Sequence, residues 1–164
     1  MGNKKIEKNI LIVGLVDEFL DKISSTLAFN LNKYYLNIDE LINYYISEKQ
    51  KMLELCGVEY FEEQERKVIT SLKDYENTLM FAKFSTFSSY IDTFKENCII
   101  IYVQINMKSI KKNKKDKFAT ENLNFLVFQE RETFLKNNCN NVIKCDINNL
   151  DESLKLLEDY LTQG

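Results

Sequence analysis

Apolar residues along the chain fall into two patterns, short and mostly unbroken runs and longer stripes with a helical spacing. The runs cover residues 9–13, 34–38, 78–82, 98–103 and 142–145. Runs of this length are typical of strands that are buried on both faces of a parallel sheet. The sequence therefore predicts five strands.

Segments with helical character separate these runs. Apolar residues recur at helical spacing in two stripes, Leu20-Ile23-Leu27-Leu31 and Leu150-Leu154-Leu157-Leu161. Such stripes form the buried face of an amphipathic helix. Further helices are predicted over residues 39–55, 59–72, 88–94 and 121–136, with a division near Gly57.

The last of these segments, 121–136, follows a basic and polar stretch at 111–117 that predicts a loop. The positions within the helix that we expect to be buried are Leu123, Leu126, Val127 and Phe134. Strands that alternate with helices imply right-handed crossovers between parallel strands. The predicted fold is therefore α/β, a doubly wound, mainly parallel five-stranded sheet flanked by helices, in a single domain spanning residues 1–164.

Missing residue types narrow the chemistry. The chain has no histidine, which excludes a Ser-His-Asp or Cys-His mechanism. Its only interior glycines are Gly14 and Gly57, so neither G-x-x-x-x-G-K-[ST] nor G-x-G-x-x-G occurs. These are the usual sequence signals for a loop that cradles phosphate.

Charge and cysteine usage exclude further classes. A net charge of −3 and a pI near 5.2 argue against a nucleic-acid partner. No apolar run approaches the roughly 18 residues of a membrane span. The four cysteines, Cys56, Cys98, Cys139 and Cys145, form no C-x-x-C pair, which favours buried, reduced thiols in a cytoplasmic protein and gives no support for a metal site.

Several motif remnants follow the order of a known family. The first apolar run ends at Gly14, and Asn37-Ile38-Asp39 follows the second strand without any gap in the spacing. Phe61 and Glu65 follow Gly57, and Glu130-Arg131 lies in the predicted helix before the last strand. In this order the chain resembles the shikimate kinase family of P-loop phosphotransferases, over roughly residues 9 to 160.

The family's phosphate-binding loop is where the chain departs from this resemblance. Phe19 stands where the family has a glycine, Leu20 replaces its lysine, and Asp21 replaces the hydroxyl residue that holds Mg²⁺. The degenerate loop is thus formed by Gly14, Asp17, Glu18, Phe19, Leu20 and Asp21. Each like-charge contact between a carboxylate and phosphate at ~4 Å costs ~1 kcal/mol in water and ~4 kcal/mol at an effective dielectric constant of ~20.

Two interpretations of these carboxylates stay open. Asp17, Glu18 and Asp21 fit the start of a helix, where acidic residues are stabilising. Alternatively, Asp17 and Asp21, one helical turn apart, bind a divalent cation.

The substrate side of the family's site is better matched. Asp39 lies at the position of the second carboxylate of the family's D-x-D motif, and Arg131 at that of an arginine that holds the substrate carboxylate. The resemblance implies that both bind substrate. The structural alternatives are that Asp39 caps the next helix and that Arg131 pairs with Glu65 or another acid. The family's glycine-rich loop has no counterpart in residues 81–86, and its arginine-bearing lid corresponds to 108–117, which carries only lysines.

The sequence thus predicts a catalytically inactive protein with a shikimate kinase-like fold and no cofactor. It would bind a small anionic ligand near Asp39 and Arg131, or a protein partner. The second case predicts an exposed apolar patch of Phe19, Leu20, Phe84 and Phe87. The alternative is an active shikimate or other small-molecule kinase with a non-standard nucleotide site, which would use ATP and Mg²⁺. The oligomeric state is left open.

Overall fold

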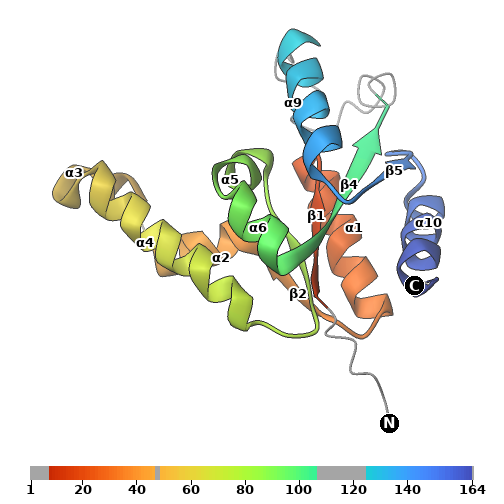
Figure 1. The fold of residues 1–164 in the computed structure, drawn as a ribbon, viewed down its shortest axis with the longest axis horizontal. Helices are drawn as coiled ribbons and strands as arrows, with labels where there is room; N and C mark the ends of the chain where they lie inside the picture. Colours follow the sequence, from red (N-terminus) through yellow and green to blue (C-terminus); the bar gives the residue numbers. More distant parts are fainter. Residues whose placement is uncertain (1–7, 47–48, 107–124, 164) are drawn as a thin grey trace.

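A parallel sheet forms the centre of the protein in a computed structural model that describes residues 8–46, 49–106 and 125–163 (Figure 1). Its strands lie in the order β2-β3-β1-β4-β5, and every neighbouring pair is parallel. The strands are β1 Asn9–Val13, β2 Tyr34–Asn37, β3 Thr78–Phe81, β4 Cys98–Ile105 and β5 Asn141–Cys145. The predicted doubly wound sheet and its five strands are confirmed.

The central strand β1 explains why its sequence is almost wholly apolar. All five of its residues are buried, because β3 pairs with it on one side, β4 on the other, and helices cover both faces. At Asn9 the side chain bonds to the backbone, donating to the Tyr75 carbonyl at 2.7 Å and accepting from the Thr78 N–H at 3.0 Å. The one polar residue of the strand is thereby satisfied at the point where β3 begins.

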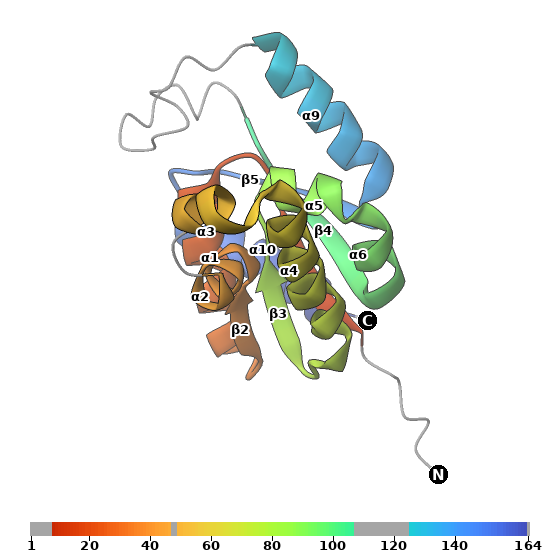
Figure 2. The same ribbon diagram turned by 90° about the vertical axis from the view of Figure 1, so that its left-hand side faces the viewer.

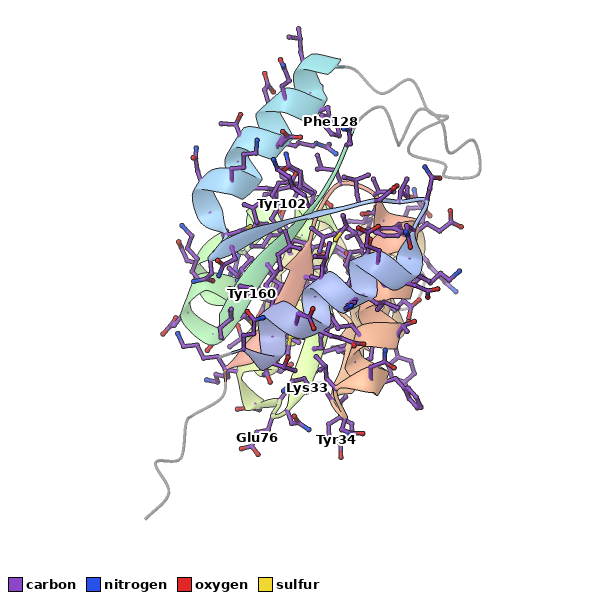
Figure 3. All side chains as sticks on the ribbon, turned by 90° about the vertical axis from the view of Figure 1, so that its right-hand side faces the viewer. Lys33, Tyr34, Glu76, Tyr102, Phe128 and Tyr160 are labelled. Carbon is purple, nitrogen blue, oxygen red and sulfur yellow. The ribbon has the colours of Figure 1, made fainter. Side chains whose placement is uncertain are left out.

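Helices pack against both faces of the sheet. The helices are α1 Asp17–Asn30, α2 Ile38–Tyr45, α3 Lys49–Cys56, α4 Val58–Ser71, α5 Phe84–Ser89, α6 Ile91–Asn97, α9 Phe125–Asn138 and α10 Leu150–Thr162. Two of them, α1 and α10, contact each other and cover one face (Figure 3). On the opposite face lie α4, α5 and α6 (Figure 2). No helix in the described part of the chain is long and apolar enough to span a membrane.

Both predicted helical stripes face the core. Leu20, Ile23 and Leu27 of α1 are fully buried, and Leu154 and Leu157 of α10 are buried as well. Removing a leucine or isoleucine side chain from water contributes about 1.5–3 kcal/mol, so these stripes fix the faces that the two helices bury.

Two of the predicted helices are divided in the structure. Residues 39–55 form two helices, α2 and α3, because the chain leaves helical geometry at Ile46, whose side chain is buried in the core. In place of one helix over 88–94 there are α5, which begins at Phe84, and α6, with a non-helical Tyr90 between them. The division at Gly57 is confirmed, and its φ of 84° is one that a glycine adopts without strain.

The prediction of buried positions in α9 was partly wrong. Leu126 is 66% exposed and Val127 is 38% exposed, whereas Phe128 and Leu135 are buried and Phe134 is partly buried against the core. The reason is that the start of α9 rises beyond the carboxyl ends of the strands, so that only part of the helix meets the core (Figure 1). Leu123 and the predicted loop 111–117 lie outside the described residues.

Candidate functional site

The topology of the sheet indicates a ligand site at the carboxyl end of β1. From β1 the chain runs to the edge strand β2 and returns inward to β3 on one side of β1, and then crosses to β4 and β5 on the other side. Ligands of open α/β sheets bind outside the carboxyl ends of the strands at such a switch point. The turn after β1, residues 14–16, and the turn after β3, at Ala82 and Lys83, lie together there, since Gly14, Leu15 and Lys83 line one cavity.

Apolar side chains fill the turn after β1. Val16 and Leu20 are fully buried, Leu15 is 5% exposed and Phe19 is 9% exposed. The Leu20 side chain folds back onto Gly14, where a Cβ atom would lie 2.8 Å from Leu20 Cδ1 and 2.9 Å from the Val103 carbonyl oxygen. The side chain at the position of the family's lysine is therefore part of the core.

The backbone of the same turn is short. Helix α1 begins at Asp17, directly after the three residues Gly14, Leu15 and Val16. The N–H of Leu20 donates to the Val16 carbonyl at 3.0 Å, as an ordinary helical bond. A P-loop instead directs successive N–H groups from an extended glycine-rich loop at the phosphate oxygens. Here the N–H of Leu20 is already engaged within the helix.

Asp21 joins α1 to β2. Its Oδ1 accepts hydrogen bonds from the Tyr35 hydroxyl and, at 3.1 Å, from Asn37 Nδ2. Burial, together with the bond to the Asp21 carboxylate, raises the pKa of Tyr35 well above its usual range. The Asn37 amide is also the N-cap of α2, since its Oδ1 accepts from the Glu40 N–H at 3.1 Å. Asp21 and Asn37 thus have structural partners.

Asp39 links two elements that are distant in the sequence. Its Oδ2 accepts from the Lys83 N–H at 2.8 Å and its Oδ1 accepts from the Thr86 hydroxyl at 2.6 Å. The cap of α2 is Asn37, so the alternative in which Asp39 caps this helix was wrong. The carboxylate instead holds the start of α5, a helix with no side-chain cap of its own at Lys83.

Arg131 extends from α9 toward the same edge of the sheet. Its guanidinium carbon lies 4.9 Å from the centroid of the Phe84 ring, which meets Phe134 edge-to-face at 5.6 Å. Glu65, which the sequence offers as a partner of Arg131, accepts a hydrogen bond from the Tyr90 hydroxyl at 2.7 Å. An arginine over an aromatic face keeps its in-plane N–H donors directed outward.

A small cavity brings several of these residues together. It has a volume of about 110 Å³, and its lining includes Gly14, Asp17, Lys83, Phe84 and Arg131. Asp39 is connected to this cavity through its bond to Lys83 but is not part of its lining. Pockets for cofactors and drug-sized ligands usually have roughly 300–1,000 Å³. This cavity therefore matches an anion of a few atoms.

The described residues give little support for a metal site or a reactive thiol. Within the described residues no group of three or more Asp, Glu, Cys or His side chains is placed to hold a metal ion. All four cysteines are free; Cys98 and Cys145 are buried as predicted, Cys139 is partly buried, and Cys56, the last residue of α3, is exposed, so that the prediction of a buried thiol was wrong there. Burial raises the pKa of Cys98 and Cys145 to about 11 and that of Cys139 to about 12, so these thiols are protonated and poorly nucleophilic at neutral pH.

Known structures share this fold at low sequence identity. Shikimate kinase from Bacteroides thetaiotaomicron superposes with a TM-score of 0.74 and 12% identity, covering 94% of this chain and 98% of that one. The enzyme from Aquifex aeolicus gives 0.66 and 18%, covering 95% and 99%. The enzyme from Acinetobacter baumannii, in complex with shikimate, gives 0.64 and 17%, covering 96% and 94%. The chain therefore has the P-loop kinase fold seen in shikimate kinases, as its motif remnants predicted.

Sequence comparisons do not extend this finding. No protein-family model and no curated protein sequence matches the chain. The similarity to known proteins is therefore one of fold alone, and it assigns no role to any single residue of the site.

Sequence reasoning missed the polar groups that hold the candidate site together. Tyr35 and Thr86 bond the two carboxylates Asp21 and Asp39, and the backbone of Lys83 completes the second contact. Residue types alone give no signal for these pairs, because Asp39 is 44 residues from Lys83 and 47 from Thr86.

Proposed function

We propose that this protein is a catalytically inactive relative of the shikimate kinase fold that binds a small anion rather than a nucleotide. The observation that carries the proposal is the burial of Leu15, Val16, Phe19 and Leu20, the side chains that fill the turn after β1. In this account the turn contributes to the core and has no phosphate-binding role.

The energetic argument begins with what a triphosphate would have to displace. Opening the turn would expose Phe19 and Leu20, at a cost of about 1.5–3 kcal/mol for each side chain. Glu18, exposed in the first turn of α1, would add repulsion toward the phosphates. A helix N-terminus alone attracts an anion by about 0.3–1 kcal/mol at an exposed site, which does not offset these costs.

Support for a small anion comes from the side chains around the cavity. Lys83 and Arg131 bring two positive charges, against the single carboxylate of Asp17. Arginine binds carboxylate or phosphate through two parallel hydrogen bonds, and the guanidinium of Arg131 lies over the Phe84 ring in the lining of this cavity. The ligand class that fits this charge and volume is a small carboxylate or inorganic phosphate.

A protein partner at this edge has less support. The predicted apolar patch does not form, because Phe19, Leu20 and Phe87 are buried and Phe84 is partly covered by Arg131 and Phe134. We therefore favour a small ligand over a docked protein at this site. Cytoplasmic localisation remains a prediction from the cysteine content.

The test is turnover. Purified protein is incubated with ATP, Mg²⁺ and shikimate, and ADP formation is followed beside an active shikimate kinase. The proposal expects no ADP above the protein-free reaction. Turnover in the ordinary enzyme range of roughly 1–10³ s⁻¹ would end it and establish the active-kinase alternative.

Anion binding is tested separately, by titrating inorganic phosphate and then shikimate in a calorimeter. Arg131→Ala is expected to weaken binding at least about tenfold, the loss typical of a charged hydrogen-bond pair. Arg66→Ala is the matched control, because Arg66 is the chain's other arginine and lies on α4 outside the cavity lining.

A further inference from the structure

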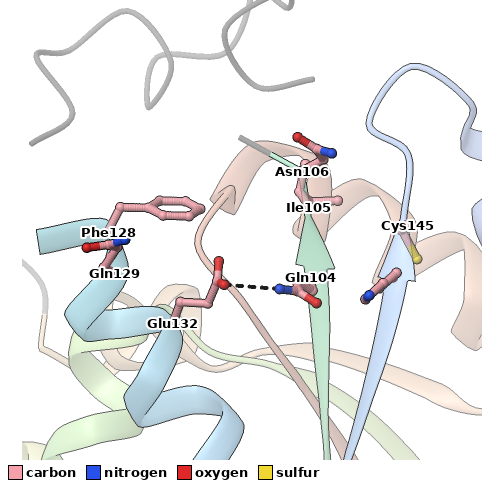
Figure 4. Close-up of a pocket in the computed structure, with 8 residues that line it drawn as sticks. Gln104, Ile105, Asn106, Phe128, Gln129, Glu132 and Cys145 are labelled. Carbon is pink, nitrogen blue, oxygen red and sulfur yellow. Dashed lines mark hydrogen bonds between the residues drawn. The ribbon is translucent and has the colours of Figure 1, made fainter. Parts of the chain in front are cut away.

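A second and larger cavity lies between α9 and the carboxyl ends of β4 and β5 (Figure 4). Its volume is about 430 Å³, within the roughly 300–1,000 Å³ that small-molecule sites occupy. It shares no lining residue with the cavity that contains Arg131. Its chemistry is therefore independent of the proposed function.

One wall of this cavity carries a carboxylate that is held in position. The side chain of Glu132 is 22% exposed; its Oε1 accepts a hydrogen bond from Gln104 Nε2 at 3.1 Å and forms an ion pair with Lys136 Nζ, also at 3.1 Å. The other carboxylate oxygen points into the space between α9 and β4 (Figure 4). A largely buried carboxylate is stable only where hydrogen-bond donors or cations surround it, and Gln104 and Lys136 supply them here.

Gln104 has an unsatisfied acceptor beside that carboxylate. Its Oε1 is buried and has no hydrogen-bond partner among the described residues. The donation of Nε2 to Glu132 fixes this orientation of the amide, because the reverse orientation would place two acceptors together. Leaving a buried acceptor unpaired costs about 1–3 kcal/mol of stability. A ligand donor that bonded both to Gln104 Oε1 and to the Glu132 carboxylate would therefore be favoured.

An ammonium group is such a donor. If it entered between Glu132 and Gln104, a half-turn of the amide would direct both Gln104 Oε1 and the carboxylate toward its three N–H bonds. The terminal torsion of glutamine is broad, so this half-turn requires little strain. The insertion replaces one hydrogen bond by two charged ones and pairs the Gln104 oxygen, while Nε2 turns to the buried position that this oxygen leaves.

The rest of the lining limits what can carry this ammonium. Lys144 borders the same cavity and would repel a ligand with only positive charge, whereas it attracts a carboxylate. Phe128, Ile105 and Cys145 supply apolar surface between the charged groups. We propose that this cavity binds a small zwitterion of the amino acid class, with its ammonium at Glu132 and Gln104 and its carboxylate at Lys144.

The experiment is a calorimetric titration of the full chain with each of the twenty free proteinogenic L-amino acids. At least one is expected to bind in the millimolar range or more tightly. Its decarboxylated amine and its N-acetyl derivative should both bind at least about tenfold more weakly, because each loses one charged contact. The proposal is overturned if none of the twenty binds at millimolar concentration, or if both derivatives bind as well as the parent amino acid.

Variants assign the binding to this cavity. Gln104→Met keeps the length of the side chain but has no amide oxygen. It is expected to weaken the binding of the amino acid at least about tenfold. Lys144→Gln, at an exposed position that tolerates the change, should remove the preference for the amino acid over its decarboxylated amine. Lys155→Gln, on the exposed side of α10, is the control and should change neither. If Gln104→Met fails to fold, Lys144→Gln is the deciding variant. The proposal is overturned if Lys144→Gln keeps the preference for the amino acid over its decarboxylated amine.

Discussion

Two turns at the same edge of the sheet are closed in opposite ways. The turn after β1 is filled by apolar side chains, with Leu20 packed against Gly14. The turn after β3, one strand away, is held by polar contacts from Asp39 to Lys83 and Thr86. The comparison shows that neighbouring turns at one edge of a parallel sheet can be closed by apolar packing or by polar hydrogen bonds.

The largest effect is expected at the first turn, from restoring the family's lysine. Leu20→Lys would bury a charge at a position with no exposed surface. We expect it to lower the free energy of unfolding by at least the ~2–5 kcal/mol typical of Leu→Ala at such sites, without producing nucleotide binding. Urea denaturation measures the first effect and an ATP titration the second.

The matched control is Glu18→Lys, two residues earlier on the exposed side of the same helix. It is expected to change stability by only about 0.3–1 kcal/mol, through the helix dipole. If Leu20→Lys were as stable as Glu18→Lys, the packed turn described here would be incorrect.

A smaller effect is expected at the second turn. Asp39→Ala removes the acceptor for two hydrogen bonds and leaves the Lys83 N–H and Thr86 hydroxyl to find other partners. We expect a loss of about 2–3 kcal/mol in unfolding free energy, because a bond to a charged group contributes more than a neutral one. Asp39→Asn, which keeps one oxygen, should lose less.

A double-mutant cycle with Thr86→Val sharpens this prediction. The coupling energy between Asp39 and Thr86 is expected to be about 0.5–3 kcal/mol, whereas the exposed Glu40 should show none with Thr86. Equal coupling for both carboxylates would mean that the second turn is not held by Asp39.

Much of the fold was predictable because burial leaves a simple signature. The run 98–103 in β4 and the stripe of Leu20, Ile23 and Leu27 are apolar because both strand and helix face the core. The start of α9 misled the prediction, since Leu126 and Val127 are apolar yet exposed where the helix rises past the sheet. Residue types alone do not show where a helix extends beyond the sheet against which it packs.

The candidate site was predictable only in part. The absence of glycine and lysine in residues 15–21 predicts a degenerate phosphate loop, because phosphate binding depends on those residue types, and this stays a prediction. The burial of Leu20 in the turn could not be read from residue types alone. The contacts of Asp39 with the turn after β3 could not be predicted, because they depend on how α2 and α5 are placed in space.

The contact between Asp21 and Tyr35 gives a pH prediction for the first turn. The pKa of Tyr35 is raised in the folded protein, so this residue contributes stability below the usual tyrosine pKa near 10. That contribution is lost as the pH rises above 10, since the unfolded chain ionises first. The decline in unfolding free energy above pH 10 should be shallower in Tyr35→Phe than in the natural chain, and equal slopes would contradict the buried contact.

The smallest effect is expected from Phe84, which supports Arg131 at the second turn. Phe84→Leu keeps much of the apolar volume but removes the aromatic face beneath the guanidinium. The stability is expected to fall by about 0.5–1 kcal/mol from the lost cation–π contact. In the Phe84→Leu background, Arg131→Ala should then lower the unfolding free energy by less than it does in the natural chain. An equal loss in both backgrounds would exclude this contact.

The most direct test of the central claim is the melting temperature of the protein as a function of Mg·ATP concentration. A ligand that binds only the folded state at 100 times its Kd stabilises it by about 2.7 kcal/mol. Because the turn after β1 is occupied by Leu15, Val16, Phe19 and Leu20, we predict no change up to millimolar ATP. A saturable rise in melting temperature, with the β-phosphate against the amides at the start of α1 in a crystal of the complex, would contradict this account.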